Sequence, residues 1–117
     1  MLENKILIVD DSKTQINSLV LQIKQWHLDN ERQQTKIVAV NDGLKALREI
    51  EKDDYNIIFL DINMPIVDGI VVLKKIRTIK SKKDLKVIIV TSLADEATKD
   101  EVKRLHANGY IEKPAKR

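Results

Sequence analysis

The sequence predicts one α/β domain, residues 1–117, in which helices cover both faces of a doubly wound parallel sheet. Two observations predict this class. Five short runs of β-branched and aliphatic residues have the continuous apolar character of strands buried on both faces. The four segments between these runs have the helical spacing of apolar residues or helix-start signals. Because strands and helices alternate, right-handed crossovers would make the strands parallel.

The expected strands end where polar or turn-forming residues follow an apolar run. They are residues 5–9, 36–40, 56–60, 86–90 and 110–111. The expected helices are residues 12–28, 41–52, 69–80 and 95–107. No internal repeat, low-complexity tract or interdomain linker is visible, so the chain is expected to form a single domain.

The ends and inner faces of these helices are indicated by particular residues. Either Ser12 or Asp11 can cap the first helix, Asp42 can cap the second, and Asn108 with Gly109 is expected to stop the fourth. The predicted inward residues are Ile16, Leu19, Val20 and Ile23 in the first helix, and Leu44, Leu47 and Ile50 in the second.

A fifth helix is missing from the predicted alternation. Only residues 114–117 follow Lys113 after the last expected strand. Without a helix there, an apolar patch is expected on the sheet face beside the first helix, and such patches mark interfaces. The chain is therefore expected either to be cut from a longer protein, as its N-terminal domain, or to be covered by a partner. A free-standing single-domain protein remains the alternative.

Composition and charge exclude several classes of protein. Hydrophobic residues make up 43% and charged residues 33% of the chain, which is ordinary for a globular domain. It has no cysteine and no apolar stretch long enough for a signal or membrane segment, so a cytoplasmic protein without membrane contact is expected. The basic run at residues 74–83 lacks aromatic residues and suits a helix end, so no direct nucleic-acid binding is expected.

Three aspartates stand directly after predicted strands. Asp10 and Asp11 follow the first strand, and Asp61 follows the third. In open α/β sheets the ligand site lies just beyond the carboxyl ends of the strands, so these carboxylates converge if the strands are neighbours. Like charges held so close require a counter-ion, and carboxylate oxygens suit a hard cation such as Mg²⁺. Asp11 alone would be a helix cap, but the set of three favours a metal site.

Two further residues could bind a phosphoryl group beside the carboxylates. Lys113 follows the last predicted strand and can neutralise the group as a point charge. Thr91 follows the fourth predicted strand, and its hydroxyl can donate a hydrogen bond to a phosphoryl oxygen. An aspartate beside Mg²⁺ can act as a nucleophile and form an aspartyl phosphate. The residues therefore indicate phosphoryl transfer onto a carboxylate.

Four segments of the chain resemble the signature segments of bacterial response-regulator receiver domains. They are Ile8-Val9-Asp10-Asp11-Ser12, residues 60–69 (Leu-Asp-Ile-Asn-Met-Pro-Ile-Val-Asp-Gly), Val90-Thr91-Ser92 and Gly109-Tyr110-Ile111-Glu112-Lys113-Pro114. The resemblance covers the whole chain in order. It implies a flavodoxin-like sheet with strand order 2-1-3-4-5, with the last helix truncated or absent.

The resemblance also implies a role for each matching position. Asp61 would accept the phosphoryl group from a sensor histidine kinase or phosphotransfer protein. Asp10 and Asp11 would hold Mg²⁺ with Asp61, and the backbone carbonyl of Asn63 would be a further ligand. The chain would be a switch with self-catalysed phosphorylation and dephosphorylation, not an enzyme acting on a separate substrate.

Three residues would carry the response to phosphorylation in this resemblance. Thr91 would hydrogen-bond the phosphoryl group and move toward it. Lys113 would pair with the group, and its bond to Pro114 would be cis. Tyr110 would be an aromatic switch, although the residue alone could equally be plain core. The surface of the fourth helix and fifth strand would control an output domain or a homodimer, and the absent fifth helix puts these contacts in doubt.

Other functions remain as alternatives. A binding-only receiver would act as an interaction module, although the retained acidic residues count against it. An aspartate-nucleophile phosphatase would need a carboxylate where this chain has Asn63, and a substrate-enclosing cap domain is not visible. A nucleotide-binding flavodoxin-like protein would need a glycine-rich loop after the first strand, which the sequence lacks.

Overall fold

The structure of the chain is a computed structural model, which describes residues 3–29, 34–62, 69–79, 84–91 and 96–112. Its elements are β1 (Glu3–Val9), α1 (Lys13–Asp29), β2 (Gln34–Val40), α2 (Gly43–Lys52), β3 (Ile57–Asp61), α3 (Gly69–Ile79), β4 (Lys86–Thr91), α4 (Glu96–Arg104) and β5 (Gly109–Glu112). None of the helices in these ranges is long and apolar enough to cross a membrane.

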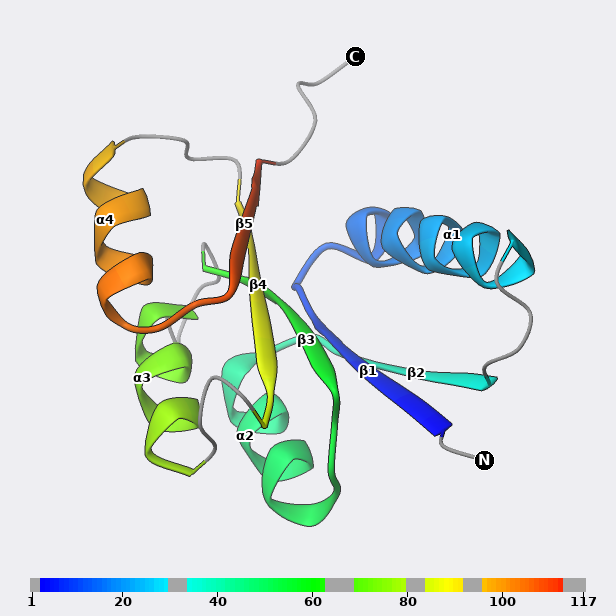
Figure 1. Cartoon of the computed structure of the whole chain (residues 1–117), viewed down its shortest axis with the longest axis horizontal. Helices are drawn as coiled ribbons and strands as arrows, with labels where there is room; N and C mark the ends of the chain where they lie inside the picture. Colours follow the sequence, from blue (N-terminus) through cyan, green and yellow to red (C-terminus); the bar gives the residue numbers. More distant parts are fainter. Residues whose placement is uncertain (1–2, 30–33, 63–68, 80–83, 92–95, 113–117) are drawn as a thin grey trace.

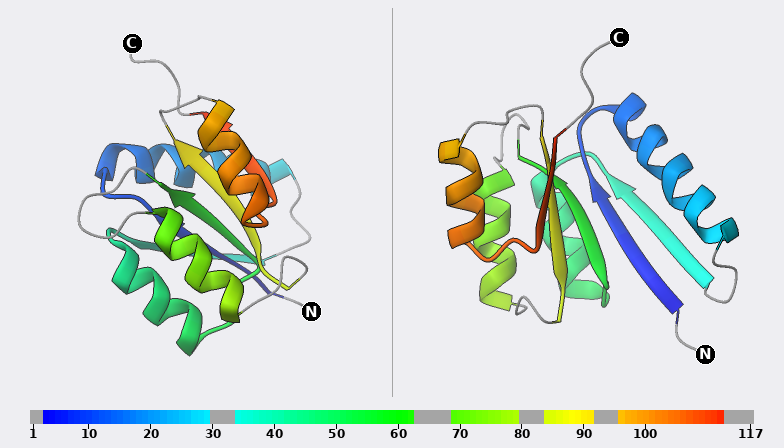
Figure 2. Two further views of the ribbon diagram at one scale, coloured as in Figure 1. Left: turned by 90° about the vertical axis from the view of Figure 1, so that its left-hand side faces the viewer. Right: turned by 45° about the horizontal axis from the view of Figure 1, so that its top comes forward.

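The strands form one parallel sheet in the order β2-β1-β3-β4-β5. Its helices are unequally divided between the two faces: α2, α3 and α4 lie on one face, and α1 lies on the other (Figures 1 and 2). This confirms the predicted doubly wound class and strand order. Within the described ranges the sheet carries four helices.

We call the face under α2, α3 and α4 the closed face. Its central strand residues Ile58, Leu60, Val87 and Ile89 are each 0% exposed. They belong to one cluster with helix residues such as Ala46 from α2, Leu73 and Ile76 from α3, and Val102 from α4. Continuous apolar runs were expected of such strands, because both of their faces are covered.

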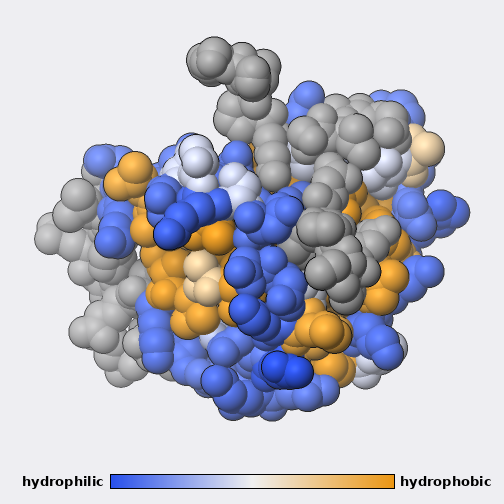
Figure 3. Space-filling view, turned by 180° about the vertical axis from the view of Figure 1, so that it is seen from behind, coloured by the Kyte–Doolittle hydropathy of each residue, from blue (hydrophilic) through white to orange (hydrophobic). Residues whose placement is uncertain are grey.

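We call the face under α1 the open face, represented by Ile57, Phe59, Ile88 and Ile111. The first three are half-buried, and Ile111 is 44% exposed. Strand register puts Ile111 level with Val90, which is buried although it lies on the same face. Under α1 itself the packing is tighter, where Ile6, Ile8 and Leu19 form a second buried cluster. Away from α1, Ile88 and Ile111 on this face are therefore partly open to solvent, whereas the predicted apolar patch stays a prediction. The view of the molecule from behind shows hydrophobic areas between hydrophilic ones (Figure 3).

Two helix predictions need correction. Leu44 was expected to point inward, but it is 53% exposed, because Gly43, Ala46 and Ile50 form the buried face of α2. The fourth helix was expected to continue to residue 107 and stop at Asn108 and Gly109. It ends instead at Arg104, and His106 adopts the left-handed conformation with φ of 68°.

Candidate metal site

Three carboxylates meet at the carboxyl edge of the sheet. Ligand atoms of Asp10, Asp11 and Asp61 all lie within 4.8 Å of one another. Asp10 and Asp61 are each 1% exposed, whereas Asp11 is exposed to solvent. The structure therefore brings together the acidic residues that the sequence singled out, and leaves one of them open to the outside.

Strand pairing explains why these residues converge. β1 lies directly beside β3, with Val9 level with Leu60, so Asp10, which follows β1, and Asp61, the last residue of β3, lie at the same edge. The Asp10 N–H donates to the carbonyl of Val40 in β2 at 3.2 Å, which continues the sheet pairing into the site. Asp10 is thereby held by backbone hydrogen bonding next to the end of β3.

The turn into α1 fixes the Asp10 side chain as well. Ser12 N–H donates to Asp10 Oδ1 at 2.9 Å. Ser12 Oγ in turn accepts from the Gln15 N–H at 3.2 Å, so Ser12 caps α1, as one of the two predicted capping residues. This turn holds one carboxylate oxygen of Asp10 in place. The turn is formed by the consecutive residues Asp10, Asp11 and Ser12.

Gly69 allows α3 to begin against the end of β3. A Cβ built at Gly69 would collide with Ile62 Cα and would lie 2.5 Å from Asp61 O. Only a residue without a side chain permits this approach. The sequence indicated a turn and helix start at this glycine, but it gave no sign of the contact with Asp61.

The donor set suits a hard divalent cation. All three side chains offer carboxylate oxygens, which are preferred by Mg²⁺, Ca²⁺ and Mn²⁺ over softer metals. Two of the carboxylates are buried, and buried charge is costly unless an opposite charge lies beside it. The residues present therefore fit a bound divalent cation.

Thr91 lies on the strand next to this cluster, and Tyr110 lies one strand further away. Thr91 ends β4 and is fully buried, one position beyond Val90, which is level with Asp61 on β3. Tyr110 is half-buried on β5, beside Ile89. The Lys99 ammonium nitrogen on α4 lies 5.6 Å from the centroid of the Tyr110 ring. The sequence did not indicate this last contact, because it joins separate elements.

Two predicted site residues lie outside the described residues. These are Asn63, whose carbonyl was expected to bind the metal, and Lys113, which was expected to pair with a phosphoryl group. The expected cis bond before Pro114 also lies outside them. The roles of these residues stay predictions.

The fold and the carboxylates together define a class of protein. The sheet is open and parallel with the order 2-1-3-4-5, and the carboxylates lie at its carboxyl edge, where doubly wound α/β proteins bind their ligands. The chain belongs to the response regulator receiver domain family, which matches residues 6–117.

Similar proteins agree with this assignment. The chain is 34% identical over 110 residues to chemotaxis protein CheY-3 of Vibrio cholerae, covering 94% of this chain and 80% of that protein. It is 35% identical over 118 residues to hybrid signal transduction histidine kinase L of Dictyostelium discoideum, covering 97% of this chain but 7% of the kinase. The Mn²⁺-bound form of response regulator Rcp1 superposes with a TM-score of 0.75 at 27% identity, covering 97% of this chain and 83% of that one. Membership of this family places the chain in two-component signalling.

Proposed function

We propose that the chain is a phospho-acceptor switch that takes a phosphoryl group on Asp61 from a histidine kinase or a phosphotransfer protein. The observation that carries this proposal is the carboxylate cluster, in which a buried Asp61 at the end of a central strand lies within 4.8 Å of Asp10 and Asp11. The likeness to a segment of a hybrid histidine kinase supports a partner of this kind.

Asp61 is the best placed of the three to be the acceptor. It continues β3, which pairs with β1 on one side and β4 on the other. A phosphoryl group on its carboxylate would therefore lie beside Thr91, whose hydroxyl can donate to a phosphoryl oxygen. Asp11 is exposed and lies outside the paired strands, so it is better suited to binding the cation than to accepting phosphate.

In the reaction, a carboxylate oxygen of Asp61 attacks phosphorus and the bond from phosphorus to the donor nitrogen breaks. The donor imidazole leaves, and Asp61 becomes an aspartyl phosphate. Asp10 and Asp11 would hold Mg²⁺ with Asp61, and the bound cation would neutralise charge on the phosphoryl oxygens. The likeness to a Mn²⁺-bound response regulator supports a divalent cation in this position.

The proposal includes how the switch is used. Hydrolysis of the aspartyl phosphate resets the chain, which makes it a self-resetting switch and not an enzyme with a separate substrate. The α4 and β5 surface would carry the signal to an output domain or a second copy. We place the switch in the cytoplasm, where a chain without cysteine is well suited.

Intact mass spectrometry tests the proposal directly. Incubation with Mg²⁺ and acetyl phosphate is expected to add the mass of one phosphoryl group to the wild-type chain. Asp61→Asn should abolish the adduct, whereas Asp54→Asn, an exposed carboxylate away from the cluster, should keep it. Removing the cation with a chelator should also abolish it.

The alternative functions predict different results. A folded chain that binds Mg²⁺ but forms no adduct would be a binding-only receiver. An adduct that persists in Asp61→Asn would place the acceptor elsewhere. Rapid turnover of an added phosphate ester without a lasting adduct would favour a phosphatase.

A further inference from the structure

The outer sides of α2 and α3 expose an unusual share of apolar side chains. The two helices contact each other on the closed face (Figures 1 and 2). Both begin at the carboxyl edge of the parallel sheet, because α2 follows β2 and α3 follows β3. Among the described residues, five large hydrophobic side chains are exposed to solvent, and three of them are on these helices: Leu44, Val71 and Ile79.

Each helix presents a row of three exposed residues that are four positions apart. The row on α2 is Leu44, Arg48 and Lys52, and the row on α3 is Val71, Lys75 and Ile79. Residues four apart lie on the same side of a helix, one turn from each other. We call these two rows together the α2–α3 surface.

The two rows repeat one arrangement of apolar and charged side chains. Leu44 and Val71 lie in the first turn of their helices, next to the carboxyl edge of the sheet. One turn further along, each is followed by a cation, Arg48 on α2 and Lys75 on α3. A partner that matches both rows must therefore offer apolar contacts and, about 6 Å away along the helices, negative charges.

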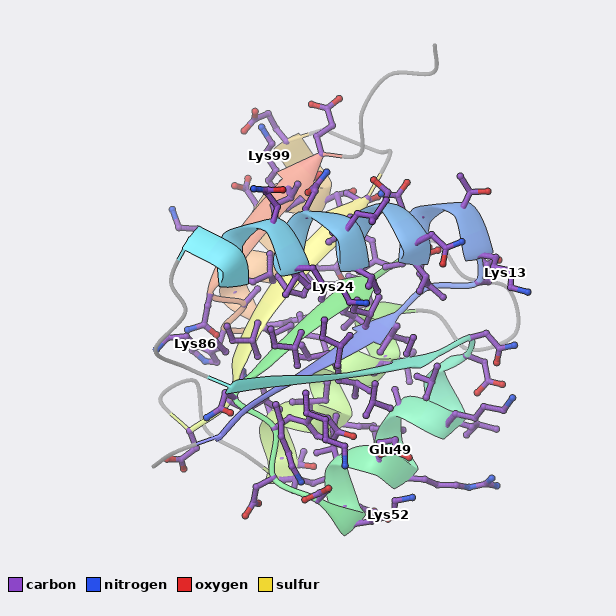
Figure 4. All side chains as sticks on the ribbon, turned by 90° about the vertical axis from the view of Figure 1, so that its right-hand side faces the viewer. Lys13, Lys24, Glu49, Lys52, Lys86 and Lys99 are labelled. Atoms are coloured by element: carbon purple, nitrogen blue, oxygen red, sulfur yellow. The ribbon has the colours of Figure 1, made fainter. Side chains whose placement is uncertain are left out.

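The charges of this surface are mainly positive. Lys52 is already engaged, because its Nζ lies 3.1 Å from Glu49 Oε2 (Figure 4). Glu51 is the exposed acid of α2, and the sequence of α3 contains none. Recognition of a negatively charged partner therefore falls to Arg48 and Lys75.

The pattern counts against three other occupants. A second copy related by a two-fold axis would place this surface against itself, and cations would then oppose cations. Nucleic acid would leave the aliphatic side chains against phosphate and sugar, and neither row contains an aromatic residue to stack on a base. A membrane-surface helix has one continuous apolar side, whereas apolar and charged residues share each row here.

We propose that the α2–α3 surface binds an acidic amphipathic helix of a partner protein. Aliphatic residues of that helix would pack on Leu44 and Val71, and its carboxylates one turn along would pair with Arg48 and Lys75. A helix fits because it has the same rise per residue as α2 and α3, and because it satisfies its own backbone hydrogen bonds. This interaction goes beyond the proposed function and does not require a phosphoryl group on Asp61.

A synthetic helical peptide provides the probe. One side of it carries leucine and glutamate one turn apart, and the other positions are alanine and glutamine. Fluorescence anisotropy should show saturable binding of the labelled peptide to the wild-type chain at micromolar concentrations. Amide chemical-shift changes on binding should be largest at residues 44–52 and 71–79.

Paired substitutions test both parts of the contact. Arg48→Glu combined with Lys75→Glu should weaken binding by at least about tenfold, because the carboxylates then meet like charges. A peptide with lysine in place of glutamate should bind this variant and recover the affinity, which would also show that the variant is folded. Leu44→Ser combined with Val71→Ser should weaken binding of the original peptide by about tenfold, because the apolar contacts are lost.

The first helix supplies matched controls. Leu21 and Lys24 are an exposed aliphatic residue and an exposed cation on α1, on the other face of the sheet. Leu21→Ser and Lys24→Glu should leave the affinity for the peptide unchanged. A loss in these variants equal to the loss in the α2 and α3 variants would overturn the assignment of the surface.

Three further results would overturn the proposal. The first is no saturable binding to the wild-type chain. The second is equal binding of a peptide with serine in place of leucine, because the surface would then respond to charge alone. The third is stronger binding of anionic phospholipid vesicles or duplex DNA through the same residues, which would assign the surface to that ligand.

The experiment is independent of the phosphoryl chemistry. It is made without Mg²⁺ and without a phosphodonor, and Asp61→Asn should bind the peptide as tightly as the wild-type chain. Failure of phosphorylation would therefore leave the binding result intact, and failure of peptide binding would leave the proposed role of Asp61 intact.

Discussion

The closed and open faces of the sheet are built from the same strands but are packed very differently. On β4, Ile89 of the closed face is 0% exposed, whereas the preceding residue, Ile88 of the open face, is half-buried. The same contrast separates Ile58 from Ile57 on β3. Because side chains alternate between faces, neighbouring residues of one type report on two environments. The stability of the domain should therefore come mainly from the closed face.

The largest expected effect comes from this matched pair. Ile89→Ala should lower the free energy of unfolding by about 3–4 kcal/mol, because it removes buried methyl groups and leaves a cavity. Ile88→Ala should cost only about 1–2 kcal/mol, since part of its side chain already contacts water. Urea denaturation of both variants measures the difference. Equal losses would show that the open face is covered as well as the closed one.

The second-largest loss of stability is expected from a substitution at Gly69, at the edge of the closed face. Gly69→Ala would force a Cβ against backbone atoms of Asp61 and Ile62, so a loss of about 2–3 kcal/mol is expected. The shift of Asp61 should also weaken divalent-cation binding, measured by titration calorimetry. Val71→Ala, on the exposed side of the same helix, is the control and should leave cation binding unchanged. Normal stability and binding in Gly69→Ala would contradict the contact.

A hydrogen bond at the margin of the closed face should have a smaller effect. The Tyr55 hydroxyl donates to Glu49 Oε1 at 2.6 Å, and Glu49 lies next to Lys52 on α2 (Figure 4). Tyr55→Phe keeps the buried ring and removes this bond, so a loss of about 1 kcal/mol is expected near neutral pH. Chemical denaturation measures it, and a variant as stable as wild type would show that the bond contributes nothing.

The same pair gives a pH dependence of known sign. Burial first, and then the bond to Glu49, raise the pKa of Tyr55 above its ordinary value of 10.0. The folded state then keeps a proton that the unfolded state loses, so this contribution to stability should fall as pH rises above about 10. The bonds from Tyr55 and then Lys52 lower the pKa of Glu49 from 4.5, so its contribution should fall as pH drops below that value. Tyr55→Phe should flatten both limbs of the stability profile.

The smallest effect is expected at the outer margin of the open face. Ile111 is 44% exposed on the edge strand β5, so Ile111→Thr should change the free energy of unfolding by less than about 0.5 kcal/mol. Thermal unfolding with a fixed buffer provides the measurement. A loss as large as that of Ile89→Ala would mean that the two faces do not differ at this strand.

The order of the strands in the sheet was predictable only from the family resemblance. The positions of the strands along the chain were predictable from their apolar residues alone. The run predicted at residues 86–90 is apolar from Val87 onward, as is typical of a strand buried inside a sheet, and the structure confirms it as β4 (Lys86–Thr91). The convergence of Asp10 and Asp61 was also predictable, because parallel strands end at a common edge. Both predictions combine a local pattern of residues with the rule that ligand sites lie at the carboxyl ends of parallel strands.

The errors arise where distant contacts decide the conformation. The sequence predicts that α4 runs to residue 107, because Asn108 and Gly109 favour a stop. The helix ends at Arg104 instead, and His106 takes the left-handed conformation while its carbonyl accepts from Arg77 on another helix. Leu44 was expected to be buried because it is apolar, but Ala46 lies on the inner face instead. Spacing within one helix cannot reveal which face a neighbouring helix will cover.

Because the carboxylates lie at one end of the sheet, a fluorescent label can be attached at the other end without touching them. Asp54 is exposed in the segment between α2 and β3, near the opposite end of that strand from Asp61. Because the chain contains no cysteine, Asp54→Cys would introduce a unique thiol for a fluorescent dye. A label there would be separated from the phosphoryl chemistry by the length of β3, and could follow a partner's arrival or departure without occupying its site.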